Sequence, residues 1–595
     1  MTVYFPTRVA QASYGQPSPV LFLFFFFFFF VCVCVQSKRG SMKGKKETAD
    51  MWIEQVNPAI GKTLEPVERN TVGDVKLAVR HARDAQKVWV ALSFAERAKH
   101  VEKVKRFLAD NAERGASIIS QCNGKTRCDA LATEILPSVM ACEWYAANTA
   151  RVLAPQKLSR GNMLFFNKSN TLQYIPLGVV GIISPWNFPF TIPFSEVIMA
   201  LMAGNGVVLK VATATTHVGR FIEECISAGG FPPGLFVHVV MQGSDVGPAM
   251  LKAGVDKLFF TGSVHIGKQL MAAAAETLTP VSLELGGNDP MIVLADASIE
   301  RAVNCALWAG FQNAGQACAS VERIYVHESI HDEFLSELAA KTRALRHGPD
   351  VNFNVDIGAV TTEIQLRTIK EHVEDAISRG ARIVAQSTPT GDVSSGNFYP
   401  ATVLTGVTAD MLVMREETFG PVLPVVPFST EEEAIAMAND CRFALTSSVF
   451  SRNRANAWRV AEKLESGVVS INDHLYEHGM SEVPWGGWKN SGIGRTHGEL
   501  GLKEMCHVRC INNDSLPSGF IHRDLWWFPQ SHELYDTLLH AVSVAAPRGV
   551  THAMVNFFSL MKRAGVVFRP WRPQIATCES ALRSAAKKET KSKTL

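Results

Sequence analysis

Short apolar runs separated by helical stretches are the feature that most restricts the fold of this chain. Five of them lie between residues 177 and 285 and read LGVVGIIS, GVVLKV, LFVHVV, KLFFTG and PVSLEL. Each is rich in Val, Ile and Leu and is bounded by Gly, Pro or polar residues, which is typical of buried parallel strands in βαβ units. A second series from about 290 to 470 predicts another α/β region with a parallel sheet.

Length and the N-terminal half add a helical layer and more than one domain. A chain of 595 residues exceeds what one hydrophobic core usually supports, so two or three domains are expected. Residues 71–150 repeat apolar side chains at helical spacing, with Asp or Ser near each start, and predict amphipathic helices.

Charge and cysteine spacing exclude two classes of partner. The 59 basic and 56 acidic residues leave a formal charge of +3, and no basic stripe with interleaved aromatic residues is present in the central region, which argues against nucleic acid as a partner. The cysteines show no metal-ligand spacing, so no metal site is predicted. Scattered cysteines of this kind suit free thiols in a reducing compartment.

Residues 1–50 form an unusual apolar leader. Residues 20–35 read VLFLFFFFFFFVCVCV and precede the basic stretch SKRGSMKGKK. This pattern is compatible with a signal-anchor segment, although it is short for a membrane span of about 20 residues. A run of Phe followed by alternating Val and Cys is also what an untranslated leader would encode if it were joined to the gene, and both interpretations stay open.

One strand end has the features of a phosphate site. The stretch FFTGSVHIGKQL leaves a predicted strand through Gly262 and Ser263 and enters a helix near Gly267, where free backbone N–H groups would face an anion. Glycine after a strand more often reflects turn chemistry alone, and the spacing is not the GxGxxG of an ordinary dinucleotide site. Lys210 ends a neighbouring strand and has the reach for a ribose or phosphate.

Several motifs, taken in their order along the chain, identify a family. They are SPWNFPF (184–190), GVVLK (206–210), FTGSVHIGK (260–268), LELGGNDP (283–290), GQACAS (315–320), EETFGPV (416–422) and PWGGWKNSGIGR (484–495). Together they resemble the aldehyde dehydrogenase superfamily from about residue 57 to about residue 508. The resemblance implies an NAD(P)-dependent α/β enzyme with a parallel-sheet cofactor domain, an α/β catalytic domain and a β-arm for oligomerisation, assembled as a homodimer or homotetramer.

The resemblance also implies a division of the chain. The predicted parts are an apolar leader or gene-model artefact at 1–50, a dinucleotide-binding domain at 51–157 and 177–283, a catalytic domain at 284–472, an oligomerisation arm at 158–176 and 473–510, and a C-terminal extension at 511–595.

Three catalytic residues follow from the matched motifs. An aldehyde carbon releases hydride only after a nucleophile has added to it, and Cys318 matches the family nucleophile. Its small neighbours in GQACAS leave room for a substrate on one side and a nicotinamide on the other. Asn187 matches the side chain that stabilises the oxyanion, together with the Cys318 backbone N–H. Glu284 matches the general base that activates water to hydrolyse the thioester.

The cofactor residues are also carried over from the family. Glu417 and Phe419 match positions that hold the nicotinamide ribose and flank the ring, and Lys210 matches a contact to the adenosine ribose. Thr213 stands where many members carry a Glu that repels a 2′-phosphate, so NADP stays open although NAD is favoured. The full predicted set is Trp186, Lys210, Thr213, Gly262, Ser263, Gly267, Glu417 and Phe419.

The sequence leaves more than one possibility open for the substrate and for the activity. Phe188, Tyr476 and Trp485 match positions that line the aldehyde tunnel and favour a hydrophobic aldehyde, with succinate semialdehyde or betaine aldehyde as the alternative. Glu196 replaces a Lys that many members keep near the catalytic Glu, and Thr496 replaces an acidic residue. These departures keep a second hypothesis open, namely a catalytically impaired binding or structural protein on the same scaffold.

The extension after residue 510 predicts a contact surface. Residues 525–545 pair Trp and Phe with a helical apolar pattern, and 554–572 end in basic residues, which suits a membrane interface. The alternative is an extra helix packed on a neighbouring subunit. The expected location is the cytoplasm, or a membrane on its cytosolic side.

Overall fold

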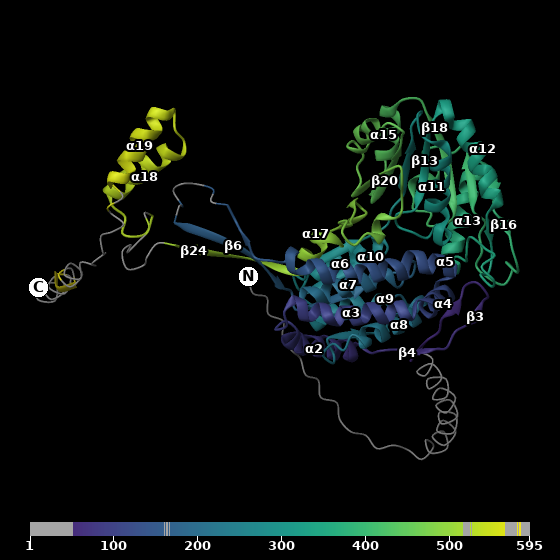
Figure 1. Ribbon diagram of the computed structural model, residues 1–595, viewed down its shortest axis with the longest axis horizontal. Coiled ribbons are helices and arrows are strands. Elements are labelled where there is room, and N and C mark those ends of the chain that lie inside the picture. Colours follow the sequence, from purple (N-terminus) through teal and green to yellow (C-terminus); the bar gives the residue numbers. More distant parts are fainter. Residues whose placement is uncertain are drawn as a thin grey trace, which may run out of the picture. The chain divides into compact units, whose positions relative to one another are not determined.

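The structure is a computed structural model, and it describes residues 51–159, 161, 165, 167–515, 524, 526–563, 565, 580 and 582–584 (Figure 1). The predictions made for residues 1–50 lie outside this range. The chain forms two compact units. The first comprises residues 51–153 and 176–507, and the second comprises residues 154–175 and the chain from Val508 onward.

The N-terminal part of the first unit is helical, as predicted. Two of its helices begin with a capping box, at Thr71 and at Ser93. In each box the hydroxyl oxygen of the N-cap residue accepts a hydrogen bond from the backbone N–H three residues later, in Asp74 or Glu96. The carboxylate of that later residue accepts from the backbone N–H of the N-cap residue. Short strand pairs precede and accompany this layer: β1 (Trp52–Ile53), β4 (Val67–Glu68), β2 (Val56–Asn57) and β3 (Lys62–Thr63). The helices are α2 (Val72–Trp89), α3 (Phe94–Asp110), α4 (Ala112–Asn123), α5 (Arg127–Ala130), the π-helix η2 (Leu131–Ile135) and α6 (Leu136–Val152).

A six-stranded sheet follows the helical layer. Its order is β23-β11-β10-β7-β8-β9, and all pairings are parallel except that of β23. The strands are β7 (Val179–Ile183), β8 (Gly206–Lys210), β9 (Phe236–His238), β10 (Lys257–Thr261), β11 (Val281–Glu284) and β23 (Gly492–Ile493). The strand order reverses between β7 and β10, and ligands bind at such switch points, outside the carboxyl ends of the strands.

The helices between these strands pack against the sheet and against one another. They are α7 (Thr191–Ala203), the 3₁₀ turn η4 (Thr213–Thr215), α8 (Thr216–Ala228), α9 (Gly243–Ala253) and α10 (Val264–Ala275). Every residue of the mostly apolar helix α7 is buried, including Glu196. The helix α10 begins at Val264 with Ser263 as its N-cap, so Gly267 lies in its first turn and not at its start, where we expected it.

A seven-stranded sheet forms the second α/β region. Its order is β15-β17-β18-β13-β12-β20-β21, with β15 antiparallel to β17 and the other pairs parallel. The strands are β12 (Asp289–Val293), β13 (Val321–His327), β15 (Arg382–Gln386), β17 (Thr402–Thr405), β18 (Val422–Phe428), β20 (Thr446–Phe450) and β21 (Val468–Ile471). The predicted α/β fold with parallel sheets is confirmed.

Helices and short pieces complete this region. The helices are α11 (Ile299–Phe311), the 3₁₀ turn η5 (Gln312–Gly315), α12 (Glu328–Ala344), α13 (Glu363–Ser378), α14 (Leu412–Arg415), α15 (Glu431–Asn439), α16 (Arg454–Ala461), the 3₁₀ turn η6 (Glu477–Gly479) and α17 (Gly498–Glu504). The two-residue strands are β14 (Arg346–His347), β16 (Thr388–Pro389), β19 (Phe443–Ala444) and β22 (Trp488–Lys489).

The second unit combines a small sheet with a helical hairpin. The sheet has the order β24-β6-β5, formed by Cys506–Asp514, Lys168–Pro176 and Gln156–Lys157. Two helices, α18 (His532–Ala545) and α19 (Val550–Arg563), follow β24. None of the helices in the described part of the chain combines the length and apolarity that a membrane crossing requires.

Candidate active site

Two cavities of the first unit meet at Cys318. One lies at the reversal of strand order and is called the switch-point cavity. Its lining comes from the ends of β7, β10 and β11 and from the loop before β18: Pro185, Trp186, Asn187, Thr261, Gly262, Ser263, Leu285, Gly286, Cys318, Gln365, Glu417 and Phe419. The other is called the apolar cavity, and it is lined by residues that include Thr133, Phe188, Ile192, Trp308, Gln312, Cys318, Leu475, Tyr476, His478 and Trp485.

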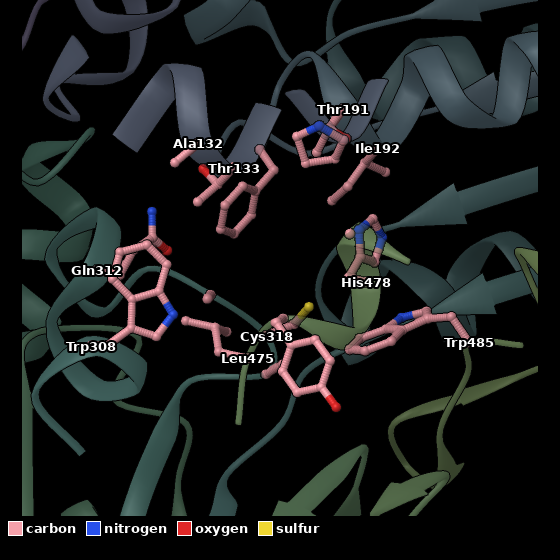
Figure 2. Close-up of a pocket in the computed structure, with 16 residues that line it drawn as sticks. Ala132, Thr133, Thr191, Ile192, Trp308, Gln312, Cys318, Leu475, His478 and Trp485 are labelled. Atoms are coloured by element: carbon pink, nitrogen blue, oxygen red, sulfur yellow. The ribbon is translucent and has the colours of Figure 1, made fainter. Parts of the chain in front are cut away.

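Figure 2 shows the apolar cavity and the direction of the Cys318 side chain. The sulfur points into the space between Ile192, Leu475 and His478. Cys318 as a whole residue is partly exposed, and its side chain lines the cavity. Because the same residue also lines the switch-point cavity, Cys318 adjoins both spaces.

An unusual backbone presents this cysteine. Asn313, Ala314 and Gly315 all have positive φ, at 53°, 55° and 70°. Such a run is costly for residues other than glycine and persists only when surrounding contacts fix it. The side chain of Asn313 supplies two of those contacts, since its Nδ2 donates to the carbonyl oxygens of Asn187 at 2.9 Å and Gln316 at 3.1 Å.

Two glycines allow other chain segments to reach the cysteine loop. A Cβ on Gly315 would lie 2.1 Å from the carbonyl oxygen of Gly420, and one on Gly287 would lie 2.0 Å from that of Cys318. Neither position tolerates a side chain without movement of the backbone. Gly315, one of the small residues noted in the sequence beside Cys318, therefore serves close backbone approach as well as access, and Gly287 serves close backbone approach after Glu284.

Asn187 lies beside the cysteine loop. Its Nδ2 donates to the carbonyl oxygen of Gln316 at 3.1 Å, and its Oδ1 is buried without a hydrogen-bond partner among the described residues. The amide thus has one N–H engaged with the backbone just before Cys318. The other N–H makes no hydrogen bond within the described residues, so it is available to a group bound in the switch-point cavity, which Asn187 also lines.

Glu284 ends β11 in a dry environment. The residue is 5% exposed, and neither carboxylate oxygen has a hydrogen-bond partner within the described part of the chain. Burial raises the pKa of Glu284 well above its usual range, the nearby Glu196 raises it further, and Arg495 opposes the shift. A carboxyl group in this state accepts a proton readily once it is ionised, which suits a general base.

Acidic neighbours also act on the cysteine. Burial raises the pKa of the Cys318 thiol, and Glu417, Asp289 and Glu284 raise it further, because a thiolate is repelled by their negative charges. In the absence of a bound cation, the thiol form is therefore favoured at neutral pH.

The opposite wall of the switch-point cavity is held by two carboxylates. Glu417 Oε1 accepts from the backbone N–H of Gly287 at 2.9 Å, and burial raises the pKa of Glu417 to about 7. Glu322 is buried and accepts from the N–H groups of Thr418 and Phe419 at 2.8 Å and 2.7 Å. Phe419 has a φ of 49°, and its ring meets that of Trp186 edge to face at 5.5 Å.

The structure separates the predicted cofactor residues into two groups. Trp186, Gly262, Ser263, Glu417 and Phe419 line the switch-point cavity together. The other three lie outside its lining: Lys210 at the end of β8, Thr213 in η4, and Gly267 in α10, packed against Leu285. Burial lowers the pKa of Lys210 to about 8.

The predicted substrate residues do come together. Phe188, Tyr476 and Trp485 all line the apolar cavity. His478 joins them, and its ring lies 5.0 Å from that of Trp485. Burial lowers the pKa of His478 to about 4, so this histidine is neutral at pH 7. Neither Lys nor Arg is among the lining residues in the described part of the chain, and Arg442 pairs with Glu416.

A buried ion pair that the motifs did not reveal holds the loop between β7 and α7. Lys125 and Glu134 have fully buried side chains, and their Nζ and Oε1 atoms lie 2.6 Å apart. The other oxygen of Glu134 accepts from the backbone N–H groups of Phe190 and Thr191 at 2.7 Å and 3.1 Å, where α7 lacks a cap of its own. Lys125 Nζ also lies 4.1 Å from the centre of the Phe188 ring.

Asn123 fixes the same loop from another direction. Its Nδ2 donates to the carbonyl oxygen of Trp186 at 3.0 Å and to Thr361 Oγ1 at 2.9 Å. The loop that carries Trp186, Asn187 and Phe188 is therefore bound at both ends to the helical layer. The sequence gives little indication of this role, because Asn123 and Lys125 stand at the end of a helix that carries several other polar residues.

Comparisons with known proteins agree with this geometry. A family model described as "Aldehyde dehydrogenase family" matches residues 45–511. A 4,4'-diapolycopene aldehyde oxidase from Methylomonas sp is 37% identical over 486 residues, which cover 81% of this chain and 89% of that protein.

Two solved structures are similar along most of their length. The NAD+ complex of an aldehyde dehydrogenase from Bacillus cereus is 32% identical, with a TM-score of 0.74, and the match covers 78% of this chain and 93% of that one. An NADP-dependent enzyme from E. coli is 33% identical, with a TM-score of 0.73, and the match covers 78% of this chain and 95% of that one.

We predict that alkylation of Cys318 by iodoacetamide, without cofactor, is slow at neutral pH and rises with pH without levelling off below about pH 9, because only the thiolate reacts. Peptide mass spectrometry measures the rate at Cys318 next to those at the exposed Cys128 and Cys510. A rate that is already maximal at pH 7 would contradict the raised pKa.

We also predict that Glu134→Gln lowers the free energy of unfolding by about 3–5 kcal/mol, because it leaves Lys125 charged and unpaired in the interior. The double variant with Lys125→Met removes the charge and keeps an acceptor for the loop, so it should lose less. Urea unfolding measures both. Glu224→Gln, in the exposed pair with Arg114, is the control and should cost less than about 1 kcal/mol. Equal losses for the single and double variants would argue against an ion-pair role.

Proposed function

Since the chain belongs to the aldehyde dehydrogenase family and oxidises aldehydes with NAD or NADP, we propose that Cys318, Asn187 and Glu284 carry out the chemistry and that the substrate is an apolar aldehyde. The observation that carries this proposal is the position of Cys318, which lines both cavities at once. A carbonyl carbon held against the sulfur from the apolar cavity would face the switch-point cavity on its other side.

The first step of the proposed mechanism is addition to the aldehyde. The Cys318 thiolate forms a C–S bond to the carbonyl carbon, and the electron pair of the C=O bond moves to oxygen. Asn187 stands beside the cysteine loop with its Nδ2 3.1 Å from the Gln316 carbonyl, and its second N–H donates to the oxyanion. Donors of this kind are worth about 3–4 kcal/mol each in comparable sites.

The switch-point cavity fits a dinucleotide. It lies where strand order reverses, and the N-terminus of α10 and the buried Lys210 are available for phosphate or ribose. Bound NAD(P) supplies a hydride acceptor. Glu417 and Phe419 would hold its nicotinamide end next to Cys318, since both line that part of the cavity. Thr213 carries no charge to repel a 2′-phosphate, so the proposal includes either dinucleotide.

Glu284 completes the proposed reaction. Loss of hydride from the adduct leaves a thioester on Cys318, and water must attack the acyl carbon to release the acid. Glu284 takes the proton from that water, the C–S bond breaks and the electron pair returns to sulfur. Its unpartnered, buried carboxylate supports this role, because no other protein group in the described part of the chain competes for the proton.

An apolar substrate is proposed from the cavity lining. Phe188, Ile192, Leu475 and Trp485 surround the thiol, and His478 is neutral at pH 7. A substrate carboxylate would find no cation among the lining residues in the described part of the chain, which disfavours succinate semialdehyde. An aromatic or long-chain aldehyde fits this lining better.

The assembly of the protein is proposed from the edges of its small sheet, and its location from its cysteines. The small sheet of the second unit has β5 and β24 as edge strands, and an exposed edge favours pairing with another chain, so we propose a homodimer or homotetramer. Nine described cysteines are free thiols, which supports a reducing compartment such as the cytosol.

The function is tested with a panel of apolar and charged aldehydes and both dinucleotides, followed by absorbance of the reduced nicotinamide. We expect Cys318→Ala to abolish turnover and Asn187→Ala to lower kcat by about 10²–10³. Glu284→Gln should give a single burst of reduced cofactor per site and accumulate an acyl-enzyme visible by mass spectrometry. Turnover that survives Cys318→Ala, or a charged aldehyde with the highest kcat/KM, would overturn the respective parts of the proposal.

The pH dependence of kcat tests the role of Glu196. Burial raises the pKa of Glu196 to about 8, so this residue becomes negatively charged as the pH rises through that value. Its negative charge raises the pKa of Glu284 and so opposes the ionisation that Glu284 needs to act as a base. Turnover should rise with pH, since the base form of Glu284 exists only above its raised pKa. Glu196→Gln removes the like charge, lowers the pKa of Glu284 and should shift the acid limb to lower pH. Glu499→Gln, on the exposed side of α17, is the control, and an unshifted limb in Glu196→Gln would contradict the interaction.

A further inference from the structure

The helical hairpin of the second unit lies beyond the part of the chain that matches the family, which ends at residue 511. A four-residue loop joins α18 to α19, and Figure 1 shows the two helices side by side. Helices joined by so short a loop run antiparallel. Nothing in the chemistry of the active site requires this hairpin, so its surface needs a separate explanation.

The interior of the hairpin is small and partly polar. Its buried residues are Leu534, Thr537 and Ala541 on α18, and Asn556 and Leu560 on α19. His540 also contributes a polar contact, with its Nδ1 2.8 Å from Asn556 Oδ1. Much of the apolar surface of these two helices is therefore not used to hold them together.

The larger apolar side chains lie outside instead. On α18 they are Tyr535, Leu539 and Val542, and on α19 they include Met554, Phe558 and Met561, all between 49% and 65% exposed. Two further exposed valines of α19, Val550 and Val555, are not part of this set. In both helices the spacing is four and then three residues, so each set forms one stripe along its helix.

The two stripes lie on the same side of the hairpin. At about 100° of rotation per residue, each stripe lies about 130–150° around its helix from the buried residues of that helix. The rotation has the same sense along the chain in both helices. Because the helices are antiparallel, an equal rotation in the same sense brings both stripes to one face. The polar residues Asp536, Ser543, Thr551 and Ser559 lie toward the other face.

Charge indicates what covers the apolar face. Residues 562–595, which begin at the end of α19, contain nine Lys or Arg and two Glu. The exposed Trp527 and Phe528 precede α18, and such rings favour the boundary between lipid and water. We propose that the apolar face of the hairpin lies on a phospholipid bilayer with anionic headgroups, held by its apolar stripes and by the cationic segment that follows.

A second copy of this chain fits the same face less well. Each copy would bring its own nine cations to the contact, and like charges brought together oppose association. An anionic bilayer instead gains from every one of them.

The proposal is tested by flotation of the full chain with vesicles of phosphatidylcholine, with and without about 30 mol% phosphatidylserine. To remove any contribution of the N-terminal apolar run to vesicle binding, all proteins carry Phe25→Asp and Phe28→Asp. We expect flotation with the anionic vesicles and little with the neutral ones. The apolar-face variant combines Leu539→Gln, Phe558→Gln and Met561→Gln. In this variant, flotation with the anionic vesicles should fall at least tenfold.

A matched control places three Gln residues on the other face. It combines Ser543→Gln, Thr551→Gln and Ser559→Gln and should float like the parent. Turnover of a water-soluble aldehyde should be equal in all variants, which shows that the enzyme is folded. Equal flotation of the apolar-face variant and the parent, or no flotation of the parent, would overturn the proposal. So would a fall in molar mass by light scattering that is confined to the apolar-face variant, because the face would then be a subunit contact.

Discussion

The buried ion pair between Lys125 and Glu134 is the contact on which the site depends most. One oxygen of Glu134 pairs with Lys125, and the other caps the start of α7 through Phe190 and Thr191. The loop before α7 also carries Trp186, Asn187 and Phe188, which face the two cavities. A charge pair with no solvent access has no alternative partner, so the loop has one low-energy position. Placement of the oxyanion donor follows from that constraint.

Burial away from water is the second constraint on the site, because it determines which groups around the thiol carry a charge. Five carboxyl groups influence or surround the site, namely Glu196, Glu284, Asp289, Glu322 and Glu417, and burial raises the pKa of every one. Such a site resists the formation of another negative charge, including the thiolate of Cys318. A cationic ring bound in the switch-point cavity would reverse this balance. Burial, together with Glu417, Asp289 and Glu284, therefore favours the protonated thiol until a positively charged partner is present.

Much of this arrangement could be predicted from the sequence, because strand pattern and motif residues are local signals. The five apolar runs that open the chain's α/β part are strands β7 to β11, and Cys318 stands in the turn where both cavities meet. The Lys125–Glu134 pair could not be predicted, since its partners are nine residues apart and meet only through the π-helix η2. Likewise, Glu322 lies inside a buried strand, where a lone acidic residue gives no indication of the loop it caps.

The apolar cavity and the hairpin have related physical consequences. An aldehyde that prefers a lining of Phe188, Leu475 and Trp485 to water also prefers lipid to water, because both transfers remove the same apolar surface from solvent. Such a substrate is concentrated in membranes and scarce in the aqueous phase. An enzyme held at the bilayer surface meets it where it is concentrated, whereas a freely diffusing enzyme depends on the small dissolved fraction. Membrane contact would thus raise the effective supply of substrate without any change in the active site.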